Sequence, residues 1–267
     1  MIDLTEKAPG PPIFIGGAGR SGTTLLRVML DSHPEIACGP ELKVLPRISE
    51  LWNELRQPLA PILGRYHVEP PDIDEAFSIL VNRLLESYRV RSGKSRIAEK
   101  TPDNVFCFAA LAKLFPRSPL VQVIRDGRDV VASLLKMKWI HPATGERDPR
   151  TTCPENAARY WVEAIRTGRK TARLSPRYVE VRYEDLVLEP EPTLMRLFAH
   201  LGVPYDPAVL EYHRRERDLT GESSAEQVQR PLDPSAVGRW RTALDAPALE
   251  TVQRIAGPTL AELGYAS

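Results

Sequence analysis

Residues 17–24 form a glycine-rich segment, Gly-Ala-Gly-Arg-Ser-Gly-Thr-Thr, whose composition suits phosphate binding. It follows the apolar run 13–15 and leads directly into residues 23–32, whose apolar side chains fall on one side of a helix. Glycines allow backbone amides to turn toward an anion, and a helix start adds free N–H groups and a favourable dipole. The alternative is a plain turn between strand and helix. The predicted phosphate contacts are Arg20, Ser21, Gly22, Thr23 and Thr24.

The spacing of Gly17 and Gly22 also fits the phosphate loop of nucleoside triphosphatases, which would make the chain a nucleotide kinase or triphosphatase. That loop requires lysine at the next position, where this chain has Thr23. The lysine reaches the terminal phosphates of a triphosphate. Its replacement argues against hydrolysis of ATP or GTP and favours a nucleotide with a different anion on its 5′ side.

A second anion site is predicted where Arg125 follows the apolar run 120–124 and Ser133 lies in the next helix. An arginine and a serine that converge from one strand–helix junction suit a phosphate monoester. The alternative is an ion pair between Arg125 and a neighbouring carboxylate, Asp126 or Asp129.

The ordered set of motifs resembles a known family. Residues 20–25 are similar to the 5′-phosphosulfate loop of sulfotransferases that use 3′-phosphoadenylyl sulfate (PAPS), and residues 14–47 most resemble tyrosylprotein sulfotransferases. The resemblance continues at Lys100, at residues 125–128 and at residues 227–240, so it spans nearly the whole chain. It implies a P-loop-like sulfotransferase fold and transfer of a sulfuryl group from PAPS to an acceptor hydroxyl. The product nucleotide would be 3′,5′-adenosine bisphosphate (PAP), and no metal is implied.

By this resemblance the catalytic residues are Glu41, Lys100 and Ser224. Glu41 is expected to act as general base, because a phenol has a pKa of about 10 and is a poor nucleophile until a base withdraws its proton. Lys100 is expected to stabilise charge on the departing bridging oxygen, and Ser224 to assist the transition state. Outside the resemblance, Glu41 would be a solvated surface charge and Lys100 a surface lysine at a strand end.

The resemblance assigns Arg125 and Ser133 to the 3′-phosphate of the nucleotide. A segment near the C-terminus is expected to cover the cofactor, with Arg239 at a position where the family has lysine. Arginine keeps the charge but presents a different donor geometry. For Tyr183, contact with the nucleotide and buried packing are both open. The remaining predicted nucleotide contacts are Tyr183, Gln227, Arg230 and Arg239.

The acceptor is left open: a tyrosine in an acidic peptide, or a small-molecule phenol or alcohol. Lys43 and Arg47 are the predicted substrate contacts, and with Arg128 they favour acidic surroundings of the acceptor. Two family arginines are replaced in this chain, one by Lys43 and a cofactor-contacting one by Met137.

Two further family positions have structural interpretations. His33 precedes Pro34 in a predicted turn and is expected to be structural, although other sulfotransferases use histidine as base. Cys38 matches a family cysteine whose disulfide partner would stand at Ala98.

Strands and helices alternate along the chain, which predicts an α/β fold with a parallel β-sheet flanked by helices on both faces. Ligands of such sheets bind at the carboxyl ends of the strands. We expect a single domain over residues 1–267 with a flexible segment 1–12, and a loop or lid at 141–154. The predicted strands are 13–15, 96–100, 120–124 and 177–183, and the predicted helices are 23–32, 72–88, 103–115, 129–138, 155–174, 191–201 and a tail from 246 with a break at Gly257-Pro258.

Composition excludes several other classes of protein. The 267 residues are 42% hydrophobic, and 36 basic residues balance 35 acidic ones, so neither disorder nor nucleic-acid binding is expected. The three cysteines are widely spaced, which argues against a disulfide framework and a zinc site. No apolar stretch approaches the roughly 20 residues of a membrane span. We therefore expect a cytoplasmic protein that does not bind membranes; the oligomeric state, a homodimer among the alternatives, is left open.

Overall fold

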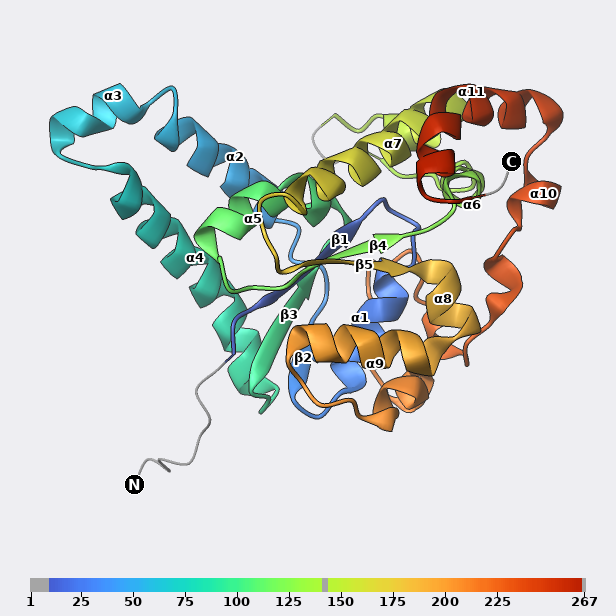
Figure 1. The fold of residues 1–267 in the computed structure, drawn as a ribbon, viewed down its shortest axis with the longest axis horizontal. Coiled ribbons are helices and arrows are strands. Elements are labelled where there is room, and N and C mark those ends of the chain that lie inside the picture. Colours follow the sequence, from blue (N-terminus) through green and yellow to red (C-terminus); the bar gives the residue numbers. More distant parts are fainter. Residues whose placement is uncertain (1–9, 141–143, 266–267) are drawn as a thin grey trace.

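The centre of the fold is a five-stranded parallel sheet with strand order β2-β3-β1-β4-β5 (Figure 1). In this computed structural model, residues 10–140 and 144–265 are described. Phe14 of β1 pairs with Glu99 on one side and with Leu120 on the other, so the carboxyl ends of β3, β1 and β4 lie side by side. The strands are β1 (Ile13–Gly17), β2 (Ile36–Cys38), β3 (Arg96–Lys100), β4 (Leu120–Ile124) and β5 (Tyr178–Arg182).

Helices cover both faces of the sheet, because successive side chains of each buried strand point to opposite sides. In β1, Phe14 faces one hydrophobic cluster, and Ile13 and Ile15 face the other. One face carries α1 (Thr23–Ser32), α8 (Tyr183–Leu188) and α9 (Pro190–Leu201). The other carries α2 (Leu45–Arg56), α4 (Pro70–Arg91), α5 (Phe108–Leu114), α6 (Gly127–Leu134), α7 (Pro154–Thr171) and α11 (Ala246–Glu262).

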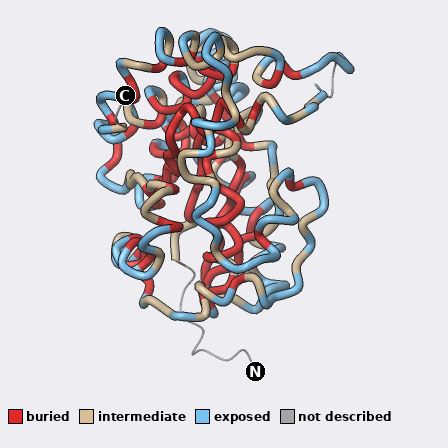
Figure 2. Tube along the Cα trace, turned by 90° about the vertical axis from the view of Figure 1, so that its right-hand side faces the viewer, coloured by how far each residue is buried: buried red, intermediate tan, exposed pale blue. Residues whose placement is uncertain are grey.

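Short helices complete the chain: α3 (Ala60–Leu63), α10 (Trp240–Ala243) and 3₁₀ turns that include η2 (Pro102–Phe106), η3 (Pro149–Thr151), η4 (Pro207–Arg214) and η5 (Gln227–Gln229). Helix α3 and the adjoining ends of α2 and α4 project from the sheet as an arm (Figure 1). Buried residues concentrate along the sheet and the helix faces that pack on it (Figure 2). None of the described helices is long and apolar enough to cross a bilayer.

The predicted fold class is confirmed, and so are all four predicted strands. The fifth strand, β2, has three residues, too few to show a sequence pattern. Helix α2 was not predicted either, because its apolar positions follow a proline-containing segment without a clear start signal. Tyr183 begins α8 rather than ending a strand. Of the predicted segments, residues 1–9 and 141–143 lie outside the described residues.

Three predicted helices differ from the observed ones. Segment 103–115 divides into η2 and α5, and the helix predicted to reach 138 ends at Leu134. The predicted break at Gly257-Pro258 is wrong, since α11 continues through Pro258 to Glu262. A proline inside a helix costs about 3 kcal/mol, because it removes one backbone hydrogen bond and its ring crowds the carbonyl one turn earlier. Burying Val252 and Leu260 contributes about 2 kcal/mol each, which together offsets that cost.

The buried face of α4 is also displaced from the predicted one. Ile73 and Phe77 are buried as expected, but Val81 and Leu85 follow them, whereas Leu80 and Leu84 are 44% and 40% exposed. The helix begins one turn earlier than its predicted cap, because Glu69 and Asp72 form a reciprocal capping box.

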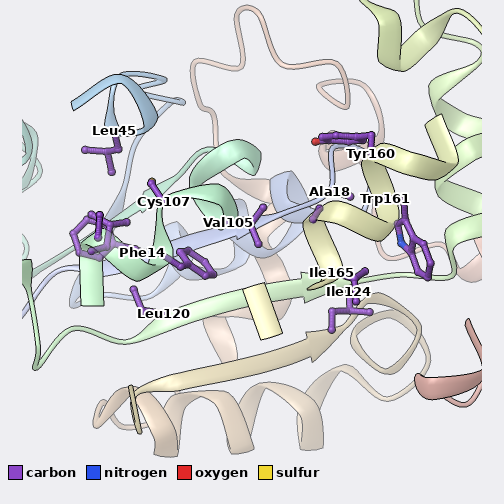
Figure 3. Packing of buried hydrophobic residues seen from close by; sticks show 14 of the residues in the cluster. Phe14, Ala18, Leu45, Val105, Cys107, Leu120, Ile124, Tyr160, Trp161 and Ile165 are labelled. Carbon is purple, nitrogen blue, oxygen red and sulfur yellow. The ribbon is translucent and has the colours of Figure 1, made fainter. Parts of the chain in front are cut away.

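The larger hydrophobic cluster connects the sheet to the site. It packs Phe14, Ile124 and Trp161 between the sheet and α7 (Figure 3). The predicted core residues of α7, including Trp161 and Ile165, are buried. The Trp161 indole Nε1 donates to the backbone oxygen of Arg125 at 3.1 Å, so the core fixes the end of β4.

Candidate active site

The glycine-rich loop turns sharply between β1 and α1. Gly22 has φ +96°, and a Cβ there would lie 2.4 Å from the ring of Tyr183, so only glycine fits. Arg20 also has a left-handed backbone, with φ +74°, a conformation that non-glycine residues rarely adopt. This sequence of turns leads into the N-terminus of α1, as an anion-binding loop requires.

The side chain of Arg20 joins the two predicted anion sites. Its Nε donates to Ser133 Oγ at 3.0 Å, and its Nη1 donates to Ser223 Oγ at 2.5 Å and to Ser224 Oγ at 2.9 Å. Arg125 Nη1 donates to the backbone oxygen of Arg20 at 3.1 Å. The two sites therefore adjoin a single cleft rather than lying apart.

That cleft is a cavity of about 200 Å³. Residues not predicted from the sequence, such as Lys136 and Tyr212, also line it. Ser21, Thr23 and Thr24 are buried in the loop and do not belong to the lining. Gln227 and Arg230 lie in and directly after η5, on the exposed side. The predicted nucleotide contacts that line the cavity are Arg20, Gly22, Arg125, Ser133, Tyr183, Ser224, Gln227, Arg230 and Arg239.

The cavity lining is rich in positive charge, and of its cations Arg125 is buried and Arg20 half-buried. Burial lowers the pKa of the Arg20 guanidinium, and the charge of Arg125 lowers it further. Arg20 forms no ion pair with a carboxylate of the described residues, and the Arg125–Asp129 pair is long, at 3.9 Å. Arg125 Nε, which belongs to the lining, is buried without a hydrogen-bond partner among the described atoms, and so is Ser21 Oγ in the loop behind the lining. Such donors favour an anionic ligand.

The ion pair that the sequence offered as the alternative for Arg125 is present only with Asp129, at the long distance of 3.9 Å. Asp126 pairs with Arg128 at 2.8 Å instead, and Asp129 accepts from the backbone amides of Gly238 and Trp240 at 2.8 Å each. These two contacts tie the segment around Arg239 to α6. Arg128 is buried and stacks over Trp240 at 4.1 Å, so it is not available to an acceptor as the sequence suggested.

The position of Tyr183 is compatible with both predicted roles, buried packing and contact with a nucleotide. It is buried, its ring closes against Gly22, and the Arg125 guanidinium lies 4.4 Å from the ring centroid. Burial raises the pKa of Tyr183, and the charge of Arg125 opposes that shift. Because the side chain also lines the cavity, packing and ligand contact are compatible.

Lys100 and Glu41 form an ion pair beside the loop. Lys100 ends β3, its side chain is 0% exposed, and its Nζ lies 2.6 Å from Glu41 Oε1 and 3.3 Å from Thr24 Oγ1. Neither Glu41 nor Lys100 is in the cavity lining. Lys43 Nζ lies 3.4 Å from Glu41 Oε2, and Arg47 is exposed in the first turn of α2. The predicted base, leaving-group cation and substrate contacts therefore share one region.

Glu99 holds the backbone that carries Glu41. Its Oε1 accepts from the Leu42 amide at 3.1 Å and from Thr101 Oγ1 at 2.7 Å, and Asn104 Nδ2 donates to its other oxygen. Thr101 Oγ1 also accepts from the Lys43 amide at 3.1 Å. Burial raises the pKa of Glu99, and these hydrogen bonds oppose that shift. No spacing in the sequence pointed to this network.

The sequence did not point to a second carboxylate beside Lys100, that of Glu222. Glu222 Oε2 lies 3.1 Å from Lys100 Nζ, and Glu222 Oε1 lies 2.7 Å from Arg27 Nε. Only its position two residues before Ser224 could have drawn attention to it.

His33 is structural, as predicted. Its Nδ1 accepts from the Glu35 amide at 3.1 Å, so its Nε2 donates to the Pro204 backbone oxygen at 2.8 Å, and the ring stacks on Phe198. Among the residues that the structure describes, no group of three or more His, Cys, Asp or Glu side chains could hold a metal ion.

Known proteins are similar to this chain in sequence and in fold. The profile of the Sulfotransferase family matches residues 11–207. Protein-tyrosine sulfotransferase A of Caenorhabditis elegans is 32% identical over 96% of this chain and 67% of its own length. Protein-tyrosine sulfotransferase 1 of Danio rerio is 31% identical, over 96% and 72%. The sulfotransferase domain from the curacin biosynthetic pathway superposes with a TM-score of 0.65 at 24% identity, over 97% of this chain and 99% of that domain, which shows a common fold.

Proposed function

The chain belongs to the sulfotransferase family, as its motifs predict, and on that premise we propose that its acceptor is a tyrosine phenol in a peptide. Family membership makes it an enzyme that transfers a sulfuryl group from PAPS to a hydroxyl. One observation carries the assignment of the reacting residues. The Glu41 carboxylate and the buried Lys100 ammonium lie 2.6 Å apart, with Thr24 of the anion-binding loop 3.3 Å from the same nitrogen.

The charged cavity fits the donor nucleotide. Arg125 is a buried cation and Arg20 a half-buried one. Within the described part of the chain, Arg20 has no carboxylate partner, Asp129 lies 3.9 Å from Arg125, and Arg125 Nε has no hydrogen-bond partner. When bound, PAPS supplies the sulfuryl group. We assign residues 20–24 to its phosphosulfate and Arg125 with Ser133 to its 3′-phosphate. Tyr183, Gln227, Arg230 and Arg239 would enclose the nucleotide from the other side of the cavity.

Glu41 and Lys100 would act in sequence. Glu41 withdraws the acceptor proton, and by analogy with phosphoryl transfer the enzyme then mainly positions the two oxygens and stabilises charge on the leaving side. Once Glu41 is protonated, its attraction for Lys100 weakens, so more of the positive charge of the ammonium acts on the leaving oxygen. Ser224 Oγ accepts from Arg20 Nη1, and its own hydroxyl proton would be donated to the leaving side. The positive charge comes from the protein, and we assign no metal to this step.

A peptide acceptor has support from the relatives and from the open side of the site. Two relatives that cover nearly the whole chain are named protein-tyrosine sulfotransferases. The Lys43 side chain is 63% exposed beside Glu41, and Arg47 is exposed nearby. Such cations favour a tyrosine flanked by carboxylates, because opposite charges attract the substrate toward the base.

The test uses radiolabelled PAPS with three acceptors: an acidic tyrosine peptide, the same peptide with phenylalanine, and simple phenols or alcohols. We expect label only in the tyrosine peptide. Label confined to the small molecules would overturn the peptide assignment. PAP is expected to raise Tm, whereas ATP with magnesium is not; the reverse result would favour a triphosphatase.

Glu41→Gln tests the base. We expect a fall in kcat of at least about 100-fold, since general bases contribute 10² to 10⁴. The affinity for PAP, measured by calorimetry, should stay within about threefold of wild type because Glu41 lies outside the nucleotide cavity. Loss of PAP binding in this variant would show that the base is assigned wrongly.

A further inference from the structure

The segment 219–226 is largely exposed, but one of its charged residues is not. The Glu222 side chain is 2% exposed, although its neighbours Gly221 and Ser223 are exposed. A carboxylate is buried at a large desolvation cost unless cations and hydrogen bonds compensate. Here two cations meet it, Arg27 at 2.7 Å and Lys100 at 3.1 Å. These two cations account for the burial of Glu222, and one of them, Lys100, is a proposed reacting group.

We propose that Glu222 is a positioning residue of the transfer reaction: its carboxylate fixes the Lys100 ammonium beside Thr24 and seats Ser223 and Ser224 on Arg20. This inference rests on the proposed roles of Glu41 and Lys100. It adds a residue to the site that acts through Lys100 and Arg20 rather than on the substrate.

Glu222 keeps Lys100 in an ion pair during proton transfer. Its ammonium has two carboxylate partners, Glu41 and Glu222. When Glu41 takes the acceptor proton, Glu222 remains the anionic partner, so the ammonium stays charged and held. Together with Arg27 these groups are neutral before the proton arrives and carry one positive charge afterwards. That charge develops beside the loop that would hold the leaving group, where it would stabilise the negative charge on the leaving oxygen.

Glu222 also anchors the segment 219–226. Arg27 is buried in α1, and its Nη1 donates to the backbone oxygen of Cys38 at 3.1 Å, so it is a fixed point. Glu222 docks on that point, and the amide of Ala225 donates to the Glu222 backbone oxygen at 3.1 Å in a tight turn. The turn presents Ser223 and Ser224 to Arg20 Nη1. Seating of Glu222 and placement of the two serines are therefore linked.

The experiment compares Glu222→Gln with Glu216→Gln in the full chain. Glu216 is an exposed carboxylate six residues earlier that forms no ion pair within the described part of the chain. With the acceptor used by the wild type, E222Q is expected to lower kcat at least about tenfold, and E216Q to leave it unchanged. In a Lys100→Ala background, E222Q should cost less than about threefold more, because both changes remove the same interaction.

Hydrogen exchange gives a readout that needs no acceptor. Amides of residues 219–226 are expected to exchange faster in E222Q than in E216Q, with the core strands unchanged. Wild-type kcat in E222Q, or full additivity with Lys100→Ala, would overturn the inference while leaving the proposed function standing. An inactive wild type that fails to bind PAP would instead count against the proposed function. If E222Q does not fold, Glu222→Asp keeps the charge but withdraws it by one methylene, and the same comparisons decide.

Discussion

At the scale of single residues, the site depends on arginines whose donors outnumber the acceptors around them. Arg125 donates to the backbone oxygens of Arg20 and Ala236, its guanidinium stacks on Tyr183, and its Nε remains unpartnered. Its position is thus fixed by the protein while donor capacity is left for a ligand. A fixed guanidinium binds a phosphate better than a mobile one, because less side-chain entropy is lost.

Arg125→Lys tests this reading of the second anion site. Lysine keeps the charge but loses the fork and the stacking on Tyr183, so we expect the Kd for PAP to rise about 10- to 100-fold, a charged hydrogen bond being worth about 1.5–3 kcal/mol. Calorimetry measures the change. Adenosine 5′-phosphosulfate, which lacks the 3′-phosphate, is the control ligand. If its affinity fell equally, Arg125 would not be the 3′-phosphate contact.

At the scale of elements, the site is assembled where strands end. The loop after β1, Lys100 at the end of β3 and Arg125 after β4 meet because these three strands are neighbours in register. The segment around Arg239 comes from a distant part of the chain and needs its own attachment. Asp129 of α6 provides it by accepting from the amides of Gly238 and Trp240.

Asp129→Asn should loosen this attachment. An asparagine amide can accept only one of the two backbone donors, which leaves a buried donor unsatisfied at a cost of about 1–3 kcal/mol. We expect faster hydrogen exchange of residues 236–242 and weaker PAP binding. Asp245→Asn is the matched control, because Asp245 caps α11 at an exposed position and asparagine caps equally well. Equal exchange in the two variants would contradict the role of Asp129.

At the scale of the whole molecule, the two faces of the sheet set which side chains can meet. Cys38 of β2 pairs with Ala98 of β3, and both belong to the same hydrophobic cluster, so their side chains share a face. Neighbouring strands lie about 4.8 Å apart, within the range that a disulfide spans. The disulfide that the family resemblance implies is thus geometrically compatible with this chain, in which Ala98 replaces the second cysteine.

Ala98→Cys is therefore expected to form a disulfide with Cys38 on oxidation. Closing a loop of this length stabilises a protein by about 2–4 kcal/mol, so Tm should rise by at least about 5 °C. Thermal unfolding with and without reductant measures the gain. The Cys38→Ser, Ala98→Cys double variant should show none. An oxidised single variant with unchanged or lower Tm would mean that the bond strains the sheet.

Buried Glu99 gives stability a pH dependence. Its pKa in the folded protein is raised above the unfolded value of about 4.3, so its contribution is present below that pH and is lost as pH rises through the folded pKa. Glu99→Gln removes the titration. We expect the Tm of the variant, relative to wild type, to increase from pH 4 to pH 8. A constant difference across that range would show that Glu99 titrates alike in both states.

Local pattern accounts for much of the fold. The buried strands 96–100 and 120–124 and the loop at 17–24 were predictable because glycine, β-branched runs and helix periodicity act over a few residues. Strand β2, the continuous α11 and the buried face of α4 were not. Each is decided by burial against distant segments, which outweighs local preference.

The sequence alone determined the chemistry available: an anion-binding turn, an arginine–serine site at Arg125 and Ser133, and Glu41 and Lys100 at family positions. Tertiary structure decided which of these groups meet. It directed Arg128 to Asp126 and Trp240, joined the anion sites through Arg20, and brought Glu222 to Lys100 across 122 residues. The reason is physical. Ion pairs among buried side chains depend on which strand ends and segments the core holds together, and no spacing along the chain encodes that.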